Sequence, residues 1–125
     1  AVSVTSEFLV LQLAHKSSNY SGKHDNWETS DIVGYKLSII SGNAVEDYCL
    51  DKDGYVRAII GTIDGPVAAP IFYWEIDKNG ILIIKDYDKK PIVKIVKISE
   101  SNNIISAECE RHEVWSKCKY RKEKY

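Results

Sequence analysis

The chain has 125 residues, of which 18 are acidic and 17 basic, and its formal net charge is −1. A chain of this length buries roughly two-thirds of its unfolded surface in one core, so we expect a single domain over residues 1–125. A charge near zero provides no global field that would attract nucleic acid or an anionic membrane. The apolar block at residues 8–14 is too short to cross a bilayer, so no membrane span is expected.

The first thirty residues differ from the rest of the chain. Residues 8–14 are apolar and fit a short helix and an extra strand equally well. Residues 17–26 have no apolar period and are rich in side chains that hydrogen-bond their own backbone, which is typical of a long loop. We therefore expect residues 1–30 to form an N-terminal element and a loop that precede a β-structure over residues 33–120.

Turn signals recur about every ten residues from Asn43 to Tyr120, with short β-branched and aromatic runs between them. They predict an all-β fold of eight antiparallel strands, near residues 33–39, 45–51, 54–63, 70–77, 80–87, 91–99, 103–110 and 112–120. Tight turns leave no room for crossover helices, so the strands form a sandwich or an up-and-down meander. We favour a meander that closes into a barrel, because closure removes both exposed edges.

One predicted strand departs from regular alternation. Lys94 and Lys97 cannot share a face of a regular strand, although both are polar residues in an otherwise apolar run. A β-bulge or a strong twist between them would place both on the wet face. We therefore expect an irregularity between Lys94 and Lys97.

The stretch from Gly34 to Cys109 resembles the small bacterial lipocalin-like, calycin-type β-barrel domains. Its Asp51–Val56 hairpin matches their Asp-x-Asp-Gly hairpin, and Trp74–Leu82 matches their Trp-x-Ile-Asp-x-x-Gly-x-Leu hairpin. Gly34–Leu37 stands where those domains have Gly-x-Trp, but the Trp is missing here. The resemblance implies a lipocalin-like barrel that is not an enzyme and that binds a small apolar molecule.

An eight-stranded barrel is either filled by its own side chains or holds one small ligand. We predict a small apolar ligand, no cofactor and no catalytic residues. Trp74 is the strongest candidate for the ligand pocket, because it lies in the most apolar strand. The residues expected to face the interior and bind the ligand are Tyr35, Leu37, Phe72, Trp74, Ile76, Leu82 and Ile84.

A second hypothesis comes from the acidic and tyrosine-rich hairpins. Proteins that inhibit a toxin or enzyme, as immunity proteins do, can mask a basic partner with complementary charge and a few aromatic anchors. Exposed tyrosines at turns would serve as anchors, among them Tyr55, Tyr73 and Tyr87. The residues proposed to bind such a basic protein partner are Glu46, Asp47, Tyr48, Glu108 and Glu110.

Three cysteines are an odd number in a chain of this size, so reduced thiols and a cytoplasmic location are slightly favoured. A Cys109–Cys118 disulfide that leaves one free thiol remains an alternative. Cys109, His112 and Cys118 could approach one zinc ion, but a structural site normally has four ligands and no fourth is evident. We therefore predict no metal site.

The remaining motifs favour no chemistry. His24–Asp25 is the closest approach to a catalytic pair, yet it lies in a polar loop, where a solvated turn is the expected role. A basic C-terminal stretch at residues 117–124 has the composition that binds phosphates and stacks on bases. A footprint for nucleic acid normally shows a domain-wide basic bias, so nucleic acid is an unlikely partner and we expect a solvated or frayed end.

Overall fold

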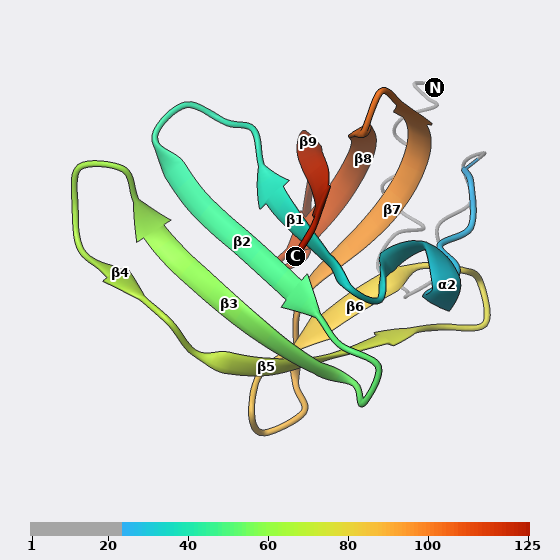
Figure 1. Cartoon of the computed structure of the whole chain (residues 1–125), viewed down its shortest axis with the longest axis horizontal. Helices are drawn as coiled ribbons and strands as arrows, with labels where there is room; N and C mark the ends of the chain where they lie inside the picture. Colours follow the sequence, from blue (N-terminus) through green and yellow to red (C-terminus); the bar gives the residue numbers. More distant parts are fainter. Residues whose placement is uncertain (1–23) are drawn as a thin grey trace.

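One helical turn and nine antiparallel strands make up residues 24–125, the part of the chain that the computed structural model describes (Figure 1). The helix α2 spans Thr29–Ile32. The strands are β1 (Tyr35–Ile39), β2 (Ala44–Leu50), β3 (Tyr55–Thr62), β4 (Val67–Ala68), β5 (Ile71–Ile76), β6 (Leu82–Lys85), β7 (Pro91–Ser101), β8 (Ile104–Arg111) and β9 (Val114–Lys124). No helix within these residues is long and apolar enough to span a membrane.

Eight of the strands close into a barrel, which confirms the predicted fold. The order is β1, β2, β3, β5, β6, β7, β8 and β9, and β9 pairs back with β1. In this closing pair Tyr35 lies opposite Lys124 and Ile39 lies opposite Tyr120. Every sheet neighbour is antiparallel, and each of the predicted strands corresponds to one barrel strand.

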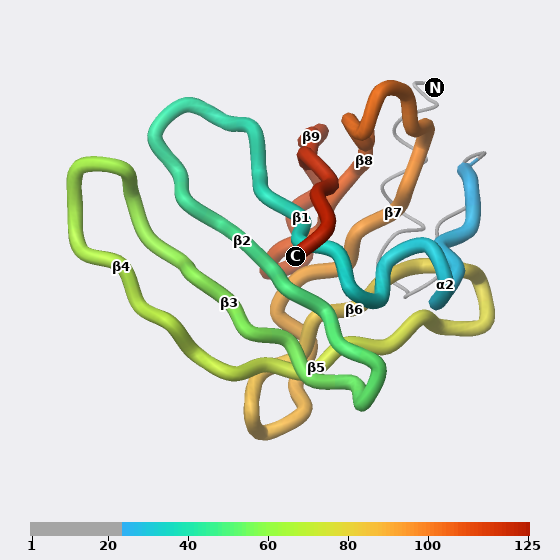
Figure 2. The backbone as a smooth tube through the Cα atoms, viewed as in Figure 1, coloured from blue at the N-terminus to red at the C-terminus, as the bar shows by residue number. Residues whose placement is uncertain are grey.

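The ninth strand, β4, lies outside the barrel. It pairs with β3 through Gly61 and Val67, and β5 continues along β3 in the same register through Arg57 and Ile71. β4 and β5 thus follow β3 one after the other, and of the two only Tyr73–Ile76 of β5 pairs with β6 on the other side. The β1–β2 and β3–β4 turns consequently project from the barrel at the upper left of Figure 2.

Three turns share one hydrogen-bond pattern, which explains the regular turn signals of the sequence. Oδ1 of Asp51, Asp77 and Asp86 each accepts the backbone N–H groups of the residues two and four positions later, at 2.8–3.1 Å. The residue three positions later has a positive φ; it is a glycine in two of the turns, Gly54 and Gly80, and Lys89 in the third. At Gly80 glycine is doubly required, because φ is +77° and a Cβ would lie 2.4 Å from Asn26 Oδ1.

The core fills the barrel with the inward side chains of all eight strands. One end is covered by the segment before β1. There the Trp27 indole N–H donates to the Ile95 carbonyl at 2.8 Å, and Ile32 of α2 is fully buried. Trp27 and Ile32 both pack in the main core, and burying side chains of this size contributes about 1.5–3 kcal/mol each to stability.

Two expectations from the sequence are wrong, and a third concerns residues outside the described part of the chain. The strand is regular between Lys94 and Lys97, which face opposite sides, and the register shift follows between Lys97 and Ser99. The basic C-terminal stretch is not frayed, because residues 120–124 pair with β1 and close the barrel. The expected helix or strand at residues 8–14 lies outside the described residues.

Candidate functional site

The residues predicted to face the interior do so. Three of them are fully buried in the core, namely Leu37, Leu82 and Ile84. Three others on the inward face of β5 are half-buried and pack against the same core, namely Phe72, Trp74 and Ile76. Tyr35 is half-buried and shares the inward face of β1 with Leu37, two residues away. Ligand binding by this set stays a prediction.

A polar cluster lies inside the opposite end of the barrel from α2. Glu46 of β2 accepts two hydrogen bonds from Nη2 of Arg111, at 2.6 and 2.8 Å. The Tyr48 hydroxyl donates to Glu46 at 2.6 Å, and the Tyr120 hydroxyl donates to it at 3.3 Å. The cluster therefore links β2 to β8 and β9, strands that are not neighbours around this part of the barrel.

The electrostatics of this cluster keep its two tyrosines and its arginine in their hydrogen-bonding forms. Burial, together with the nearby Glu46 charge, raises the pKa of both Tyr48 and Tyr120. Burial lowers the pKa of Arg111, but the Glu46 hydrogen bonds and neighbouring charges outweigh it and the pKa is raised. The phenols stay protonated and the guanidinium stays charged, so the cluster acts as a fixed cross-link rather than as a proton donor or acceptor for chemistry.

The five residues proposed to bind a basic partner do not form one surface. Tyr48 is buried and Glu46 points inward to Arg111, so neither is available as a surface anchor. Asp47 lies between them and faces outward. The prediction that Glu46 and Tyr48 lie on the surface is therefore wrong. Side chains alternate along a strand, so Glu46 and Tyr48 face the interior together with the buried Leu50.

Glu108 and Glu110 lie on the outer face of β8, away from β2. Their cross-strand partners include Lys117 opposite Glu108 and Lys94 opposite Glu110. Cross-strand pairs of opposite charge stabilise a sheet and lower its local net charge. This face of the barrel is therefore of mixed charge, not acidic.

Four exposed apolar side chains lie on the outer side of β3, β4 and β5, next to Arg57 of β3, and we call this surface the hairpin face. Ile59 lies diagonal to Val67 and Ile71 in the register, and Ile63 extends the surface at the end of β3. These four side chains are 43–61% exposed. This face is not among the features predicted from the sequence, because the prediction assigned no inward or outward side to the strand near residues 54–63.

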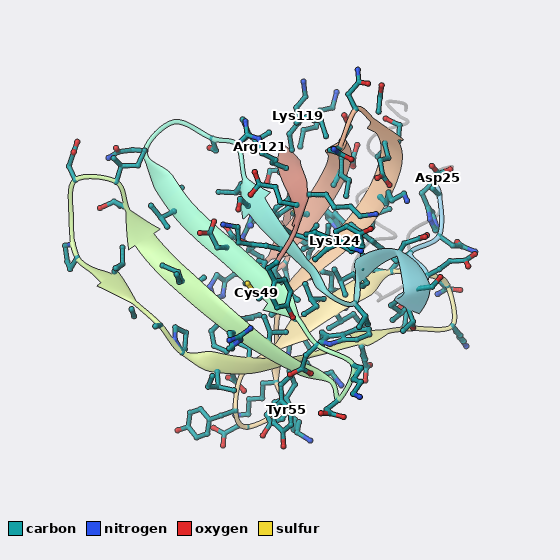
Figure 3. The ribbon with its side chains drawn as sticks, viewed as in Figure 1. Asp25, Cys49, Tyr55, Lys119, Arg121 and Lys124 are labelled. Atoms are coloured by element: carbon teal, nitrogen blue, oxygen red, sulfur yellow. A yellow bond between two sulfur atoms is a disulfide. The ribbon has the colours of Figure 1, made fainter. Side chains whose placement is uncertain are left out.

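Two tyrosines border the hairpin face at the other end. The rings of Tyr55 and Tyr73 lie 5.2 Å apart, and the Lys89 ammonium lies 4.4 Å from the Tyr73 ring centroid. Tyr55 is exposed and lies at the bottom of Figure 3, with Cys49 on the outer face of β2 above it. Tyr55 is thus exposed, as the sequence predicted, and its role as an aromatic anchor stays a prediction.

Two of the three cysteines form a disulfide, Cys109–Cys118, with Cα atoms 6.5 Å apart. The expectation of three reduced thiols is wrong, whereas the cytoplasmic location stays a prediction. The register explains the pairing, because Cys109 lies diagonal to Cys118 on one face of β8 and β9. Cys49 is the free cysteine. His112 is a turn residue with φ of +53°.

The other candidates occupy structural positions. Asp25 forms a β-bridge with Lys97, its N–H donating to the Lys97 carbonyl at 2.8 Å. No group of three or more potential metal ligands occurs among residues 24–125. On β9, Lys119 and Arg121 point outward at the top of Figure 3, while Lys122 and Lys124 share the inward face with Tyr120.

Comparisons with known proteins give no relative to guide interpretation. No protein-family model matches the chain, and neither the curated proteins nor the solved structures include a significant match.

Proposed function

We propose that this is a non-catalytic binding protein that docks a basic partner protein on its hairpin face. The observation that carries the proposal is the exposure of Ile59, Ile63, Val67 and Ile71, at 43, 61, 55 and 51%. Isolated exposed apolar residues are ordinary, but a contiguous exposed apolar surface marks an interaction site. Apolar and aromatic side chains at the centre of an interface supply most of its affinity.

The charge around the hairpin face favours a basic partner. Apart from Glu46, which faces inward to Arg111, residues 44–73 include β2 to β4 and the first half of β5 and contain four acidic and two basic residues, one of which, Arg57, lies opposite Ile71. Asp47 faces outward beside Ile59, and Asp64 lies exposed in the β3–β4 turn. A partner with positive charge around an apolar centre would gain both association rate and orientation from this rim.

The backbone adds a second means of binding. The Ala58 N–H donates to the Pro70 carbonyl, so the alternate residues Val67, Ala69 and Ile71 direct their backbone groups away from β3. Within the described residues, β6 covers only Tyr73–Ile76. A strand of the partner could therefore pair with this edge while its side chains contact the hairpin face.

The test compares two carboxylate substitutions at exposed strand positions. Ile71→Asp lies in the hairpin face, whereas Val114→Asp lies at the start of β9 and is the matched control. Proteins retained by the wild type from an extract of the source cells are identified, purified and returned to a one-to-one binding measurement. Loss of a central apolar anchor costs about 2 kcal/mol, so Ile71→Asp should raise Kd about 30-fold.

Each result of this experiment bears on the proposal. A basic protein whose affinity falls with Ile71→Asp and persists with Val114→Asp supports it. The proposal is overturned if every retained protein binds both variants equally, or if the partner that depends on Ile71 is acidic. Circular dichroism of both variants confirms that the fold persists.

A small apolar ligand inside the barrel is the second candidate. It is supported by Phe72, Trp74 and Ile76, which are half-buried on the inward face of β5 where the other strands contribute fully buried residues. Titration with fatty acids should change the tryptophan fluorescence of the wild type and of Trp115→Phe but not that of Trp74→Ala. Saturable binding that persists in Trp74→Ala would count against this candidate.

A further inference from the structure

Three lysines gather at the barrel end where β1 begins, away from the hairpin face. The register puts Lys97 opposite Ala107, Lys122 opposite Leu37 and Lys124 opposite Tyr35, all on inward faces. The side chain of Lys97 is 9% exposed and that of Lys122 is 11% exposed. Lysine is among the residues least often buried, so two such side chains at one place need an explanation.

One carboxylate serves both buried ammonium groups. Lys97 Nζ lies 3.1 Å from Glu100 Oε1, and Lys122 Nζ lies 3.4 Å from Glu100 Oε2. Among residues 24–125, no other carboxylate lies within 4.0 Å of either ammonium group. The two ammonium groups of Lys97 and Lys122 therefore share a single carboxylate among the described residues, and Lys124 lies exposed at the same barrel end.

Aromatic rings hold these ammonium groups in position. Lys122 Nζ lies 4.5 Å from the Tyr35 ring centroid and Lys124 Nζ lies 5.9 Å from it. Lys97 Nζ lies 5.5 Å from the Trp27 ring centroid. Contacts of this kind are worth about 0.5–2 kcal/mol and fix the direction of the charge, but they do not neutralise it.

Among residues 24–125, Lys97 and Lys122 carry one more positive charge than Glu100 balances, and such an imbalance is energetically unfavourable in a buried place. A buried charge without a counter-ion loses its hydration and gains no compensating ion pair. Glu100 compensates one ammonium group, and the exposed Lys124 adds a third positive charge near the Tyr35 ring that Lys122 also contacts. A second negative group at this position would complete the ion pairs, and its charge-assisted hydrogen bonds are among the strongest that a protein makes.

We propose that Lys97, Lys122 and Lys124 form a binding site for a small anion bearing a carboxylate or phosphate group. The anion lies beside Tyr35, in contact with Lys122 and Lys124, and shares Lys122 with Glu100. The site borders Leu37, which is fully buried in the filled core, so the ligand that fits it is a small anion. The inference is independent of the hairpin face, which lies on other strands.

The experiment uses calorimetric titration of the whole protein with three probes: inorganic phosphate, acetate and decanoate. Phosphate and acetate report the anion site alone, and a stronger response to decanoate than to acetate would count against a site limited to small anions. We expect saturable binding of phosphate or a carboxylate by the wild type. Because two charge-assisted contacts are involved, Lys122→Gln should weaken it about ten-fold or more.

Lys119→Gln is the matched control, because Lys119 lies on the same strand but on the outer face and forms no ion pair among the described residues. Its affinity should stay within about two-fold of wild type, since screened surface charge contributes little. Lys124→Gln replaces Lys122→Gln if the latter unfolds. The proposal is overturned if no probe binds saturably, or if Lys119→Gln weakens binding as much as the inward substitution does.

Discussion

Replacing Arg111 by methionine should destabilise the protein by about 3 kcal/mol, because a buried ion pair loses one partner. Arg111 Nη2 contacts both oxygens of Glu46, whose side chain is only 12% exposed. After the substitution the carboxylate keeps only the Tyr48 and Tyr120 hydroxyls. Hydrogen bonds to charged groups contribute about 1.5–3 kcal/mol net, and the remaining cost comes from the buried, uncompensated charge.

Glu46→Gln should cost less, about 1–2 kcal/mol, since the neutral amide still accepts from tyrosine and the half-buried Arg111 can turn to water. The double variant should then be more stable than the sum of the single losses predicts. We expect a coupling energy of about 1.5 kcal/mol, measured by urea unfolding followed by tryptophan fluorescence.

A surface pair is the control for this cycle. Lys36 and Glu123 lie 3.8 Å apart on the outer faces of β1 and β9, with side chains that are 35% and 52% exposed. The same cycle there should give about 0–0.5 kcal/mol. A stabilising interaction between Glu46 and Arg111 is refuted if the stability losses of the two single variants sum to that of the double variant within about 0.3–0.5 kcal/mol, as they do for independent sites.

Three further measurements follow from the structure. Burial raises the pKa of Glu100, but hydrogen bonds and charges from Lys97 and Lys122 outweigh it, so the pKa is lowered. The stabilising contribution of Glu100 is therefore present above its unfolded pKa and is lost as the pH falls through the lower folded pKa. The difference in unfolding free energy between wild type and Glu100→Gln should close on acidification, and a difference that persists at the lowest pH would contradict this. A double Cys109→Ser, Cys118→Ser variant should lose about 2–3 kcal/mol of stability, given the short loop, and intact mass should show two hydrogens fewer in the oxidised wild type than after reduction. His112→Asn with Glu113→Gly should raise stability by about 1 kcal/mol and Tm by about 3 °C, because both native residues have positive φ; an unchanged or lowered Tm in a calorimetric scan would argue against strain at this turn.

Local chemistry explains why most strands could be predicted from the sequence. The aspartates at positions 51, 77 and 86 hydrogen-bond backbone groups only two and four residues away, so each turn is encoded within a few positions. Alternation then assigns faces, as at Leu37 and Trp74, wherever one side is apolar. The strand boundaries and barrel closure follow from these local signals and from the need to remove exposed edges.

Features that depend on the register between distant strands could not be predicted in the same way. Glu46 and Arg111 meet only because barrel closure places β2 across from β8. The disulfide depends on Ala107 lying opposite Cys118, since a shift of one residue would turn one sulfur outward. A lysine in an apolar run is expected on the wet face, and only the position of Glu100 shows how Lys97 can be buried.

Closure of the barrel by the β1–β9 pair also sets the order in which the chain can fold. Most other barrel pairs join consecutive strands through short turns, whereas Ile39 and Tyr120 are 81 residues apart in the chain. Closing a loop of this length costs about 2.5 kcal/mol more in chain entropy than closing a short hairpin. The hairpins should therefore form first, and the β1–β9 pair should form last, which makes folding slow. Until β9 has been synthesised, one edge of β1 stays unpaired.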